Sequence, residues 1–398
     1  MAIPLAHTGL RLQSAVLRRM LHRSGQPVRG VHSAHHAVAD GLPFTKYGGR
    51  HTVTLLPGVG IGPELMQGVR KVFAAAGVPV DFEEHVLPDL ARGADVDEPF
   101  EHAVLSIRRN KVALKGNIEI KGRGENLVSR TVQLRRVLDL YVYVMEARSQ
   151  PGVKTARQSD VDVTLVRQNT EGEYFMLEHS PVRGAAESMK VVTAAASERV
   201  ARFAFEHARG QRRPRVTVVH NKATLPRSDG LFVDVALAVG SEYPEVDVDV
   251  MSVGRCCADL LHDATPFSVV LTPNLYGVYL GAILSGLVGG PGLLAGTNYG
   301  PQAAVFEPGT RNKGTDIQGR GVANPVGMLR AAADLLHFVG QRGSAALLRT
   351  AVDSALRRGT ATHDIGGHSS TDEFIQDVCD HIVAARRPWD PHTFQSSF

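Results

Sequence analysis

TVTLLPGVGIGPEL, residues 52–65, joins an apolar strand to a helix through a glycine-rich turn. Residues 52–56 have the composition of a buried strand, which the Pro57-Gly58 pair ends. Pro63 suits the first turn of a helix, and apolar side chains at helical spacing continue that helix to residue 76. A glycine turn between a strand and a helix is typical of nucleotide-binding loops. Because the glycines alternate and do not follow G-x-G-x-x-G, a tight turn that binds no ligand stays open as an alternative.

Strands and helices alternate along the rest of the chain. Apolar runs predict strands over residues 80–82, 112–114, 161–166, 216–219 and 269–271. Helical spacing predicts a helix capped by Ser197 and two C-terminal helices, over residues 328–338 and 374–384. The glycine-rich run 286–300 is expected to be a loop. This alternation predicts an α/β fold with a largely parallel or mixed sheet.

Composition excludes several classes of function. The chain has 398 residues, of which 43% are hydrophobic and 21% charged, as in globular proteins that bury a substantial core. No apolar run is long enough to span a bilayer, so we expect no membrane partner. The three cysteines, Cys256, Cys257 and Cys379, form neither a disulfide framework nor a zinc-ligand pattern, which favours a reducing compartment.

The net charge of +4 comes from the N-terminus. Residues 1–40 contain five arginines, no lysine and a single acid, Asp40, so the remainder carries equal numbers of acidic and basic residues. A neutral body has no field to attract nucleic acid, and we expect no such partner. Arginines that interrupt the apolar residues of this segment argue against a secretory signal and predict a mitochondrial transit peptide over residues 1–40. A basic tail without a targeting role is the alternative.

Six motifs, in this order, resemble those of the isocitrate/isopropylmalate dehydrogenase family. They are LPGVGIGPEL (56–65), RQNTEGEY (167–174), PNLYG (273–277), GLVGGPG (286–292), ANP (323–325) and DIGG (364–367). The family usually has an acid where this chain has Val59. Two further segments, RRNKVALKGNIE (108–119) and GTNYG (296–300), are most similar to the regulatory gamma subunits of mitochondrial NAD-dependent isocitrate dehydrogenases, with the beta regulatory subunits as the nearest alternative. The resemblance covers roughly residues 46–385.

The resemblance implies a particular domain arrangement. A large domain with a mixed sheet would comprise residues 45–140 and 290–398. A small domain would comprise residues 141–172 and 212–289. A clasp, residues 173–211, would interlock two subunits.

The family oxidises a 2-hydroxy tricarboxylate with NAD and then releases carbon dioxide, which requires a divalent cation as Lewis acid. At the positions of the three metal-binding carboxylates, the alignment places Gly254, Val278 and Ala282. None of these side chains offers an oxygen, whereas Mg²⁺ or Mn²⁺ requires about six oxygen ligands. The resemblance therefore implies that this chain binds no metal of its own.

Part of the substrate site is retained. Arg135 and Arg167 match arginines that hold substrate carboxylates, whereas a third such position is Met145. Ser129 lies close to the serine of the family's substrate loop, and Tyr174 stands at the position of the proton-relay tyrosine.

The relay lysine is replaced by Asn221. Lys222 follows one residue later, and in an extended backbone its side chain would point to the opposite face. A local rearrangement of the backbone that brings Lys222 into the relay position stays open as an alternative. Loss of a positioned acid–base group costs about 10²–10⁴ in rate, so no catalytic residues are expected in this chain.

The nucleotide segment reads RNKGTDIQG, residues 311–319, where catalytic members have H-G-T-A-P-D-I-A-G. Gamma subunits also carry R-N there and are expected to bind ADP instead of NAD. Asn312, Lys313 and Asn324 match this adenosine-binding set, except that Lys313 replaces a threonine of the gamma subunits. A surface loop without a ligand is the alternative.

These expectations together describe a non-catalytic regulatory subunit in the mitochondrial matrix. It would bind citrate and ADP as effectors, while its partner, a catalytic alpha-type subunit, would bind NAD and the metal ion, Mg²⁺ or Mn²⁺. Two alternatives stay open: a vestigial paralogue that binds no effector and an active decarboxylating dehydrogenase.

Overall fold

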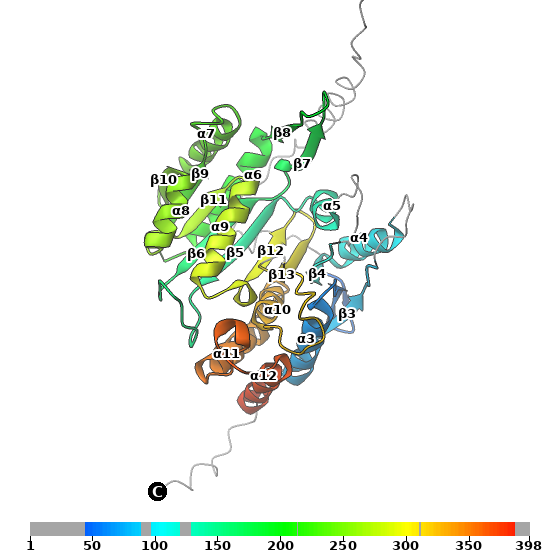
Figure 1. Ribbon diagram of the computed structural model, residues 1–398. Coiled ribbons are helices and arrows are strands. Elements are labelled where there is room, and N and C mark those ends of the chain that lie inside the picture. The colour runs from blue at the N-terminus through cyan, green and yellow to red at the C-terminus, as the bar shows by residue number, and fades with distance from the viewer. Residues whose placement is uncertain (1–43, 89–96, 120–128, 213, 310–311, 387–398) are drawn as a thin grey trace, which may run out of the picture. The chain divides into compact units, whose positions relative to one another are not determined.

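The computed structural model describes residues 44–88, 97–119, 129–212, 214–309 and 312–386 (Figure 1). The transit peptide expected over residues 1–40 lies outside the described residues, as does Arg311 of the nucleotide segment.

An eleven-stranded sheet crosses the described body in the order β1-β2-β4-β13-β12-β5-β6-β11-β9-β10, with β3 beside β2. The strands are β1 (Lys46–Tyr47), β2 (Arg50–Leu56), β3 (Val80–Glu84), β4 (Val112–Lys115), β5 (Val142–Arg148), β6 (Asp162–Gln168), β9 (Arg215–His220), β10 (Asp247–Ser252), β11 (Val269–Thr272), β12 (Ala295–Tyr299) and β13 (Ala304–Pro308). β12 runs antiparallel to both of its neighbours, and β5 runs antiparallel to β6. The expectation of an α/β fold with a mixed sheet is therefore confirmed.

Helices cover both faces of this sheet (Figure 1). They are α3 (Gly62–Ala76), α4 (Glu98–Asn110), α5 (Arg130–Val137), α6 (Ala194–Arg209), α7 (Ser228–Gly240), α8 (Val253–His262), α9 (Asn274–Leu287), α10 (Val326–Phe338), α11 (Arg342–Arg357) and α12 (Thr371–Arg386). Strand β5 shows how alternation divides the core. Val142 and Val144 belong to the hydrophobic cluster that includes α6 and α10, whereas Tyr143 and Met145 belong to the cluster that includes α8 and α9.

The predicted strands and the three helices near residues 63–76, 328–338 and 374–384 are confirmed, but the predicted start of α6 is wrong. Thr193, not Ser197, caps α6, and its hydroxyl accepts a hydrogen bond from the amide of Ala196. Ser197 lies inside the first turn and donates back to the Thr193 carbonyl. The helix begins earlier because the alanines that follow Thr193 are strong helix formers.

The prediction that residues 286–300 form a loop is also wrong. This run contains the end of α9, the 3₁₀ helix η1 (Pro291–Leu293) and the fully buried strand β12. A Cβ at Gly296 would lie 2.2 Å from the Tyr143 hydroxyl oxygen, so close packing requires this glycine. Glycine marks a close approach of two strands here, and not a loop.

The segment expected to form the clasp contains a hairpin and α6. The hairpin, β7 (Gly172–His179) with β8 (Glu187–Val191), is an antiparallel sheet separate from the large one. Helix α6 packs against α7 and against strands β6, β9 and β11 of the large sheet. In the described residues, no helix is long and apolar enough to cross a membrane.

Candidate ligand-binding site

The glycine-rich turn between β2 and α3 is held by backbone contacts on two sides. The amide of Val59 donates to the Asn117 carbonyl at 2.8 Å, and the amide of Ile61 donates to the Lys313 carbonyl at 3.0 Å. Gly60 has φ +66°, and a Cβ there would lie 1.9 Å from the Lys313 oxygen. The turn therefore requires glycine because another chain segment lies directly against it.

A first cavity of about 540 Å³ opens beside this turn. Asn312, Lys313 and Asn324 all line it, so the structure brings together the three residues expected to contact a nucleotide. Asn324 is positioned through both side-chain atoms, since it donates to Asp364 at 3.0 Å and accepts from the amide of Val326 at 3.0 Å.

A second cavity, of about 460 Å³, lies between α9 and strand β5. Arg135 and Arg167 both line it, although they come from α5 and β6. Val278 and Ala282 line the same cavity from α9, one helical turn apart. Two of the three expected metal positions thus face the arginines with side chains that hold no oxygen.

The remaining expected metal position, Gly254, lies on α8, and a Cβ there would meet nothing within 4 Å. It lines neither cavity. In the part of the chain that the structure describes, no three His, Cys, Asp or Glu side chains are arranged to hold a metal ion.

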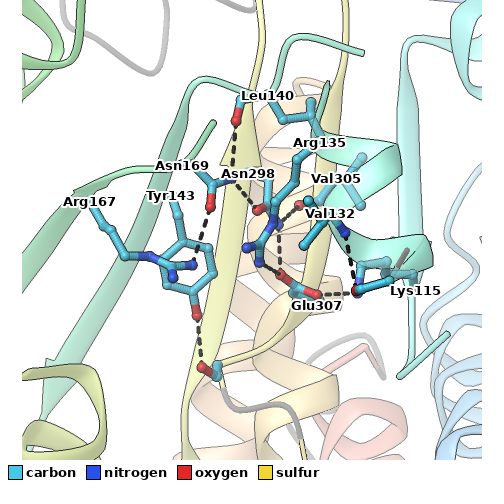
Figure 2. A network of polar contacts seen from close by, with 12 residues as sticks. Lys115, Val132, Arg135, Leu140, Tyr143, Arg167, Asn169, Asn298, Val305 and Glu307 are labelled. Carbon is cyan, nitrogen blue, oxygen red and sulfur yellow. Dashed lines mark hydrogen bonds and ion pairs between the residues drawn. The ribbon is translucent and has the colours of Figure 1, made fainter. Parts of the chain in front are cut away.

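A buried polar network connects the two cavities, and Figure 2 shows it from close by. Glu307 lies at its centre and lines both cavities. One carboxylate oxygen of Glu307 forms a short ion pair with Lys115. The other oxygen accepts from Asn298 at 2.7 Å and lies 3.6 Å from the Arg135 guanidinium. The two cations therefore share one carboxylate.

The network continues to the second arginine through two amides. Asn298 accepts from Asn169 at 2.9 Å, and Asn169 accepts from Arg167 at 3.2 Å (Figure 2). Each hydrogen bond in this series donates toward Glu307. Charge at Arg167 and charge at Glu307 are thus linked through the polarised amides between them.

Glu307 is ionised at neutral pH. Burial alone would raise the pKa of its carboxyl, but the charges of Lys115 and Arg135 and the hydrogen bonds from Lys115 and Asn298 lower the pKa to about 2. The cations that stabilise this carboxylate also face the two cavities.

Arg167 is held between strand β5 and helix α9. Its guanidinium carbon lies 4.5 Å from the centre of the Tyr143 ring, and the Tyr143 hydroxyl donates to the Gly309 carbonyl at 2.8 Å. A Cβ at Gly277 would lie 2.4 Å from the Arg167 side chain, so this glycine lets α9 approach the arginine. The orientation of Arg167 is therefore fixed by its surroundings.

Ser129 and Tyr174 line neither cavity. The Ser129 hydroxyl donates to Glu119 at 2.6 Å and accepts from the amide of Val132, which caps the helix that carries Arg135. Tyr174 lies on β7 of the separate hairpin. Ser129 therefore helps to fix the start of α5, the helix that carries Arg135.

Asn221 and Lys222 follow the end of β9 and also line neither cavity. The amide of Asn221 donates to the buried carboxylate of Asp229 at 2.6 Å. The Lys222 ammonium lies 3.3 Å from Asp234 at the surface. Lys222 is thus paired on the outside of α7 and does not occupy either cavity.

Sequence reasoning missed the residues that join the cavities: Lys115, Tyr143, Asn169, Asn298 and Glu307. A signal was present for two of them, because Lys115 and Glu307 are charged residues at or near the end of short apolar strands, where burial demands a partner. Their partners could not be identified because they come from strands far apart in the chain.

Comparison with known proteins agrees with the motif resemblance. The family model described as isocitrate/isopropylmalate dehydrogenase matches residues 52–378. The chain is 46% identical over 346 residues to isocitrate dehydrogenase (NAD) subunit gamma, mitochondrial, from Homo sapiens, covering 85% of this chain and 86% of that protein. It is 38% identical over 374 residues to the corresponding beta subunit from Homo sapiens, covering 92% and 96%.

A solved structure has the same fold. The isocitrate dehydrogenase from Methylococcus capsulatus aligns with a TM-score of 0.77 and 35% identity, covering 84% of this chain and 99% of that one.

Proposed function

Because the chain belongs to the isocitrate/isopropylmalate dehydrogenase family, we propose that it is a non-catalytic regulatory subunit of an NAD-dependent isocitrate dehydrogenase. One observation carries the proposal. Val278 and Ala282 face Arg135 and Arg167 across the second cavity, where the family places metal-binding aspartates. This cavity keeps cations for carboxylates, has no oxygen at the two expected metal positions, and pairs its Glu307 carboxylate with Lys115 and Arg135. Such a cavity is suited to holding an anion without transforming it.

Citrate is the proposed occupant of the second cavity. It is an isomer of isocitrate, so a substrate cavity that keeps two arginines retains groups suited to its carboxylates. Arg135 and Arg167 can each donate two parallel hydrogen bonds to one carboxylate. Ser129 and Tyr174 stay proposed contributors, Ser129 by placing α5 and Tyr174 from the hairpin.

ADP is the proposed occupant of the first cavity. Asn312 and Asn324 supply amide groups for hydrogen bonds to an adenosine, and Lys313 supplies a positive charge for a phosphate. NAD and the metal ion, Mg²⁺ or Mn²⁺, would be bound by the catalytic partner, where they would support hydride transfer and stabilise the enolate that forms on decarboxylation.

The proposed partner is a catalytic alpha-type subunit in the mitochondrial matrix. The β7–β8 hairpin supports contact with another subunit because Met176, Val182 and Met189 expose large apolar side chains on it. The relatives named above are mitochondrial by name. Effector binding would act on the partner if citrate and ADP have different affinities for two states of the assembled enzyme.

The test is co-purification of this chain with a catalytic alpha-type subunit, followed by measurement of the isocitrate concentration for half-maximal rate. Citrate and ADP together are expected to lower that concentration by about threefold or more, a typical size for coupling between two sites. An unchanged half-saturation would refute regulation. A complex that assembles without responding would support a vestigial paralogue instead.

A further inference from the structure

The two cavities share one charged wall residue. Pro291, Glu307, Pro308 and Asn312 line both cavities, and of these only Glu307 carries a charge. Its side chain is 7% exposed, and those of Lys115 and Arg135 are each 4% exposed. Charges this deeply buried interact strongly because little water screens them.

The contacts of Glu307 divide between the cavities. Lys115, which lines the first cavity and not the second, pairs with one carboxylate oxygen. Arg135, which lines the second cavity, lies 3.6 Å from the other oxygen. The hydrogen-bonded amides of Asn298 and Asn169 link that same oxygen to Arg167 (Figure 2).

A ligand anion that reaches Lys115 in the first cavity or Arg135 in the second would share a cation that Glu307 already engages. At Arg135 the ion-pair distance of 3.6 Å exceeds that of a direct hydrogen bond, so the guanidinium can donate to a ligand while Glu307 stays beside it. The carboxylate then repels the ligand. That repulsion grows with each negative charge that the ligand carries.

We propose that Glu307 is a charge-selectivity determinant for both cavities: a buried carboxylate that occupies the place of a ligand anion between Arg135 and Lys115. It weakens the binding of anions on either side, most strongly of those with the most charge. The assignment of citrate and ADP as the ligands rests on the proposed function above. The repulsion between the Glu307 carboxylate and a ligand anion does not depend on that assignment, because it follows from the position of Glu307 at the wall of both cavities.

Isothermal titration calorimetry on the complex with the catalytic subunit tests this with two pairs of ligands. Citrate and malate differ in carboxylate number, and ADP and AMP differ in phosphate number. In Glu307→Gln, citrate is expected to bind about tenfold tighter and malate about threefold tighter, as expected for removal of one partly screened charge. The affinity for ADP is expected to increase more than the affinity for AMP. If Glu307 served only to stabilise the fold, Glu307→Gln would bind all four ligands more weakly.

Glu206→Gln is the matched control. Glu206 is also a largely buried carboxylate in an ion pair, with Arg209, and it accepts from the Tyr243 hydroxyl at 2.9 Å. It lines neither cavity, and its replacement changes the net charge by the same amount. The affinities of all four ligands should stay within about twofold of the unmodified protein, because its charge is remote.

A second variant covers the case in which an unpaired Lys115 prevents folding. Lys115→Gln/Glu307→Gln removes both charges of the short ion pair, so no lysine is left without its carboxylate, and Arg135 stays as the buried cation beside position 307. Citrate should still bind about threefold tighter, because Lys115 does not line the second cavity. ADP should bind more weakly than to the unmodified protein, because the first cavity loses one of its two lysines, Lys115, and keeps Lys313. This opposite response of the two cavities is specific to the proposed arrangement.

Unchanged or weaker citrate binding in the folded variant would overturn the proposal, as would equal gains for citrate and malate. Absence of anion binding in both the unmodified protein and the variants would also overturn it. Failure of the proposed function would give a different result. Glu307→Gln would still bind citrate more tightly, but the isocitrate half-saturation of the unmodified complex would not respond to citrate and ADP.

Discussion

The amide of Ile61 donates a 3.0 Å hydrogen bond to the Lys313 carbonyl, which joins the glycine-rich turn directly to the nucleotide segment. Ile61 and Lys313 are 252 positions apart in the sequence, yet both residues line the same wall of the first cavity. This contact ties the local conformation of the turn to the placement of the residues expected to contact ADP.

Gly60→Ala should disrupt this wall. The residue has φ +66°, and the added Cβ would lie 1.9 Å from the Lys313 oxygen. We expect a loss of about 1–3 kcal/mol in unfolding free energy and a loss of the ADP response. Gly321→Ala is the control, because Gly321 has φ +65° but open space around its Cβ. Urea unfolding of both variants separates the steric clash from the backbone cost, and equal losses would contradict the account.

Arg167→Lys should abolish most of the citrate effect. Lysine keeps the charge but cannot contact Asn169 and a ligand carboxylate with one planar fork. The citrate concentration for half-maximal activation is expected to rise about tenfold or more. Arg199→Lys is a close match, since Arg199 lies 4.1 Å from the Tyr141 ring and pairs with Asp139 outside the cavities. A similar rise in both variants would show that the effect is not specific to the second cavity.

The stability of the protein should depend on the ionisation of Glu307. Its pKa is about 2 in the folded chain, below its ordinary value of 4.5. The ionised carboxylate therefore stabilises the fold above pH 4.5, by about 3 kcal/mol, and this stabilisation is lost as the pH falls toward 2. Urea unfolding should show a large gap between the unmodified protein and Glu307→Gln at pH 7 and a smaller gap at pH 3. A constant gap would contradict the assignment.

Carboxylates restored on α9 should recreate part of a metal site. Val278 and Ala282 both line the second cavity, and Ala282 is exposed, so Val278→Asp/Ala282→Asp places two carboxylates on the face toward the arginines. Electron paramagnetic resonance should show Mn²⁺ binding at least about tenfold tighter than to the unmodified protein. Aspartates at Ser285 and Gly286, which also line this cavity, provide a control with the same added charge. Equal Mn²⁺ binding by both double variants would mean that bulk charge, and not the helical spacing, attracts the ion.

Local sequence patterns predicted much of the fold. The strand-turn-helix at residues 52–76 and the C-terminal helices follow from apolar periodicity, which depends on neighbouring residues alone. Strand β12 was missed because Ala295, Gly296 and Asn298 have low strand propensity, and its burial between β5 and β13 outweighs that propensity.

The sequence predicted several of the residues that line the candidate site, but it did not predict the polar network that connects the two cavities. Alignment to family motifs identified Arg135 and Arg167, and the structure places both in one cavity. The role of Glu307 on β13 depends on its contacts with Lys115 on β4 and Arg135 on α5, so two strands and a helix meet there. No spacing along the chain indicates that meeting, so the network that joins the two cavities required the structure.

The most direct test of the central claim is NADH formation with isocitrate, NAD and Mn²⁺, measured for the purified chain alone and for its complex with a catalytic alpha-type subunit. The account predicts no turnover by the chain alone, and turnover by the complex at an isocitrate half-saturation that citrate and ADP lower. Turnover by the isolated chain, with Mn²⁺ bound by its own groups, would contradict it.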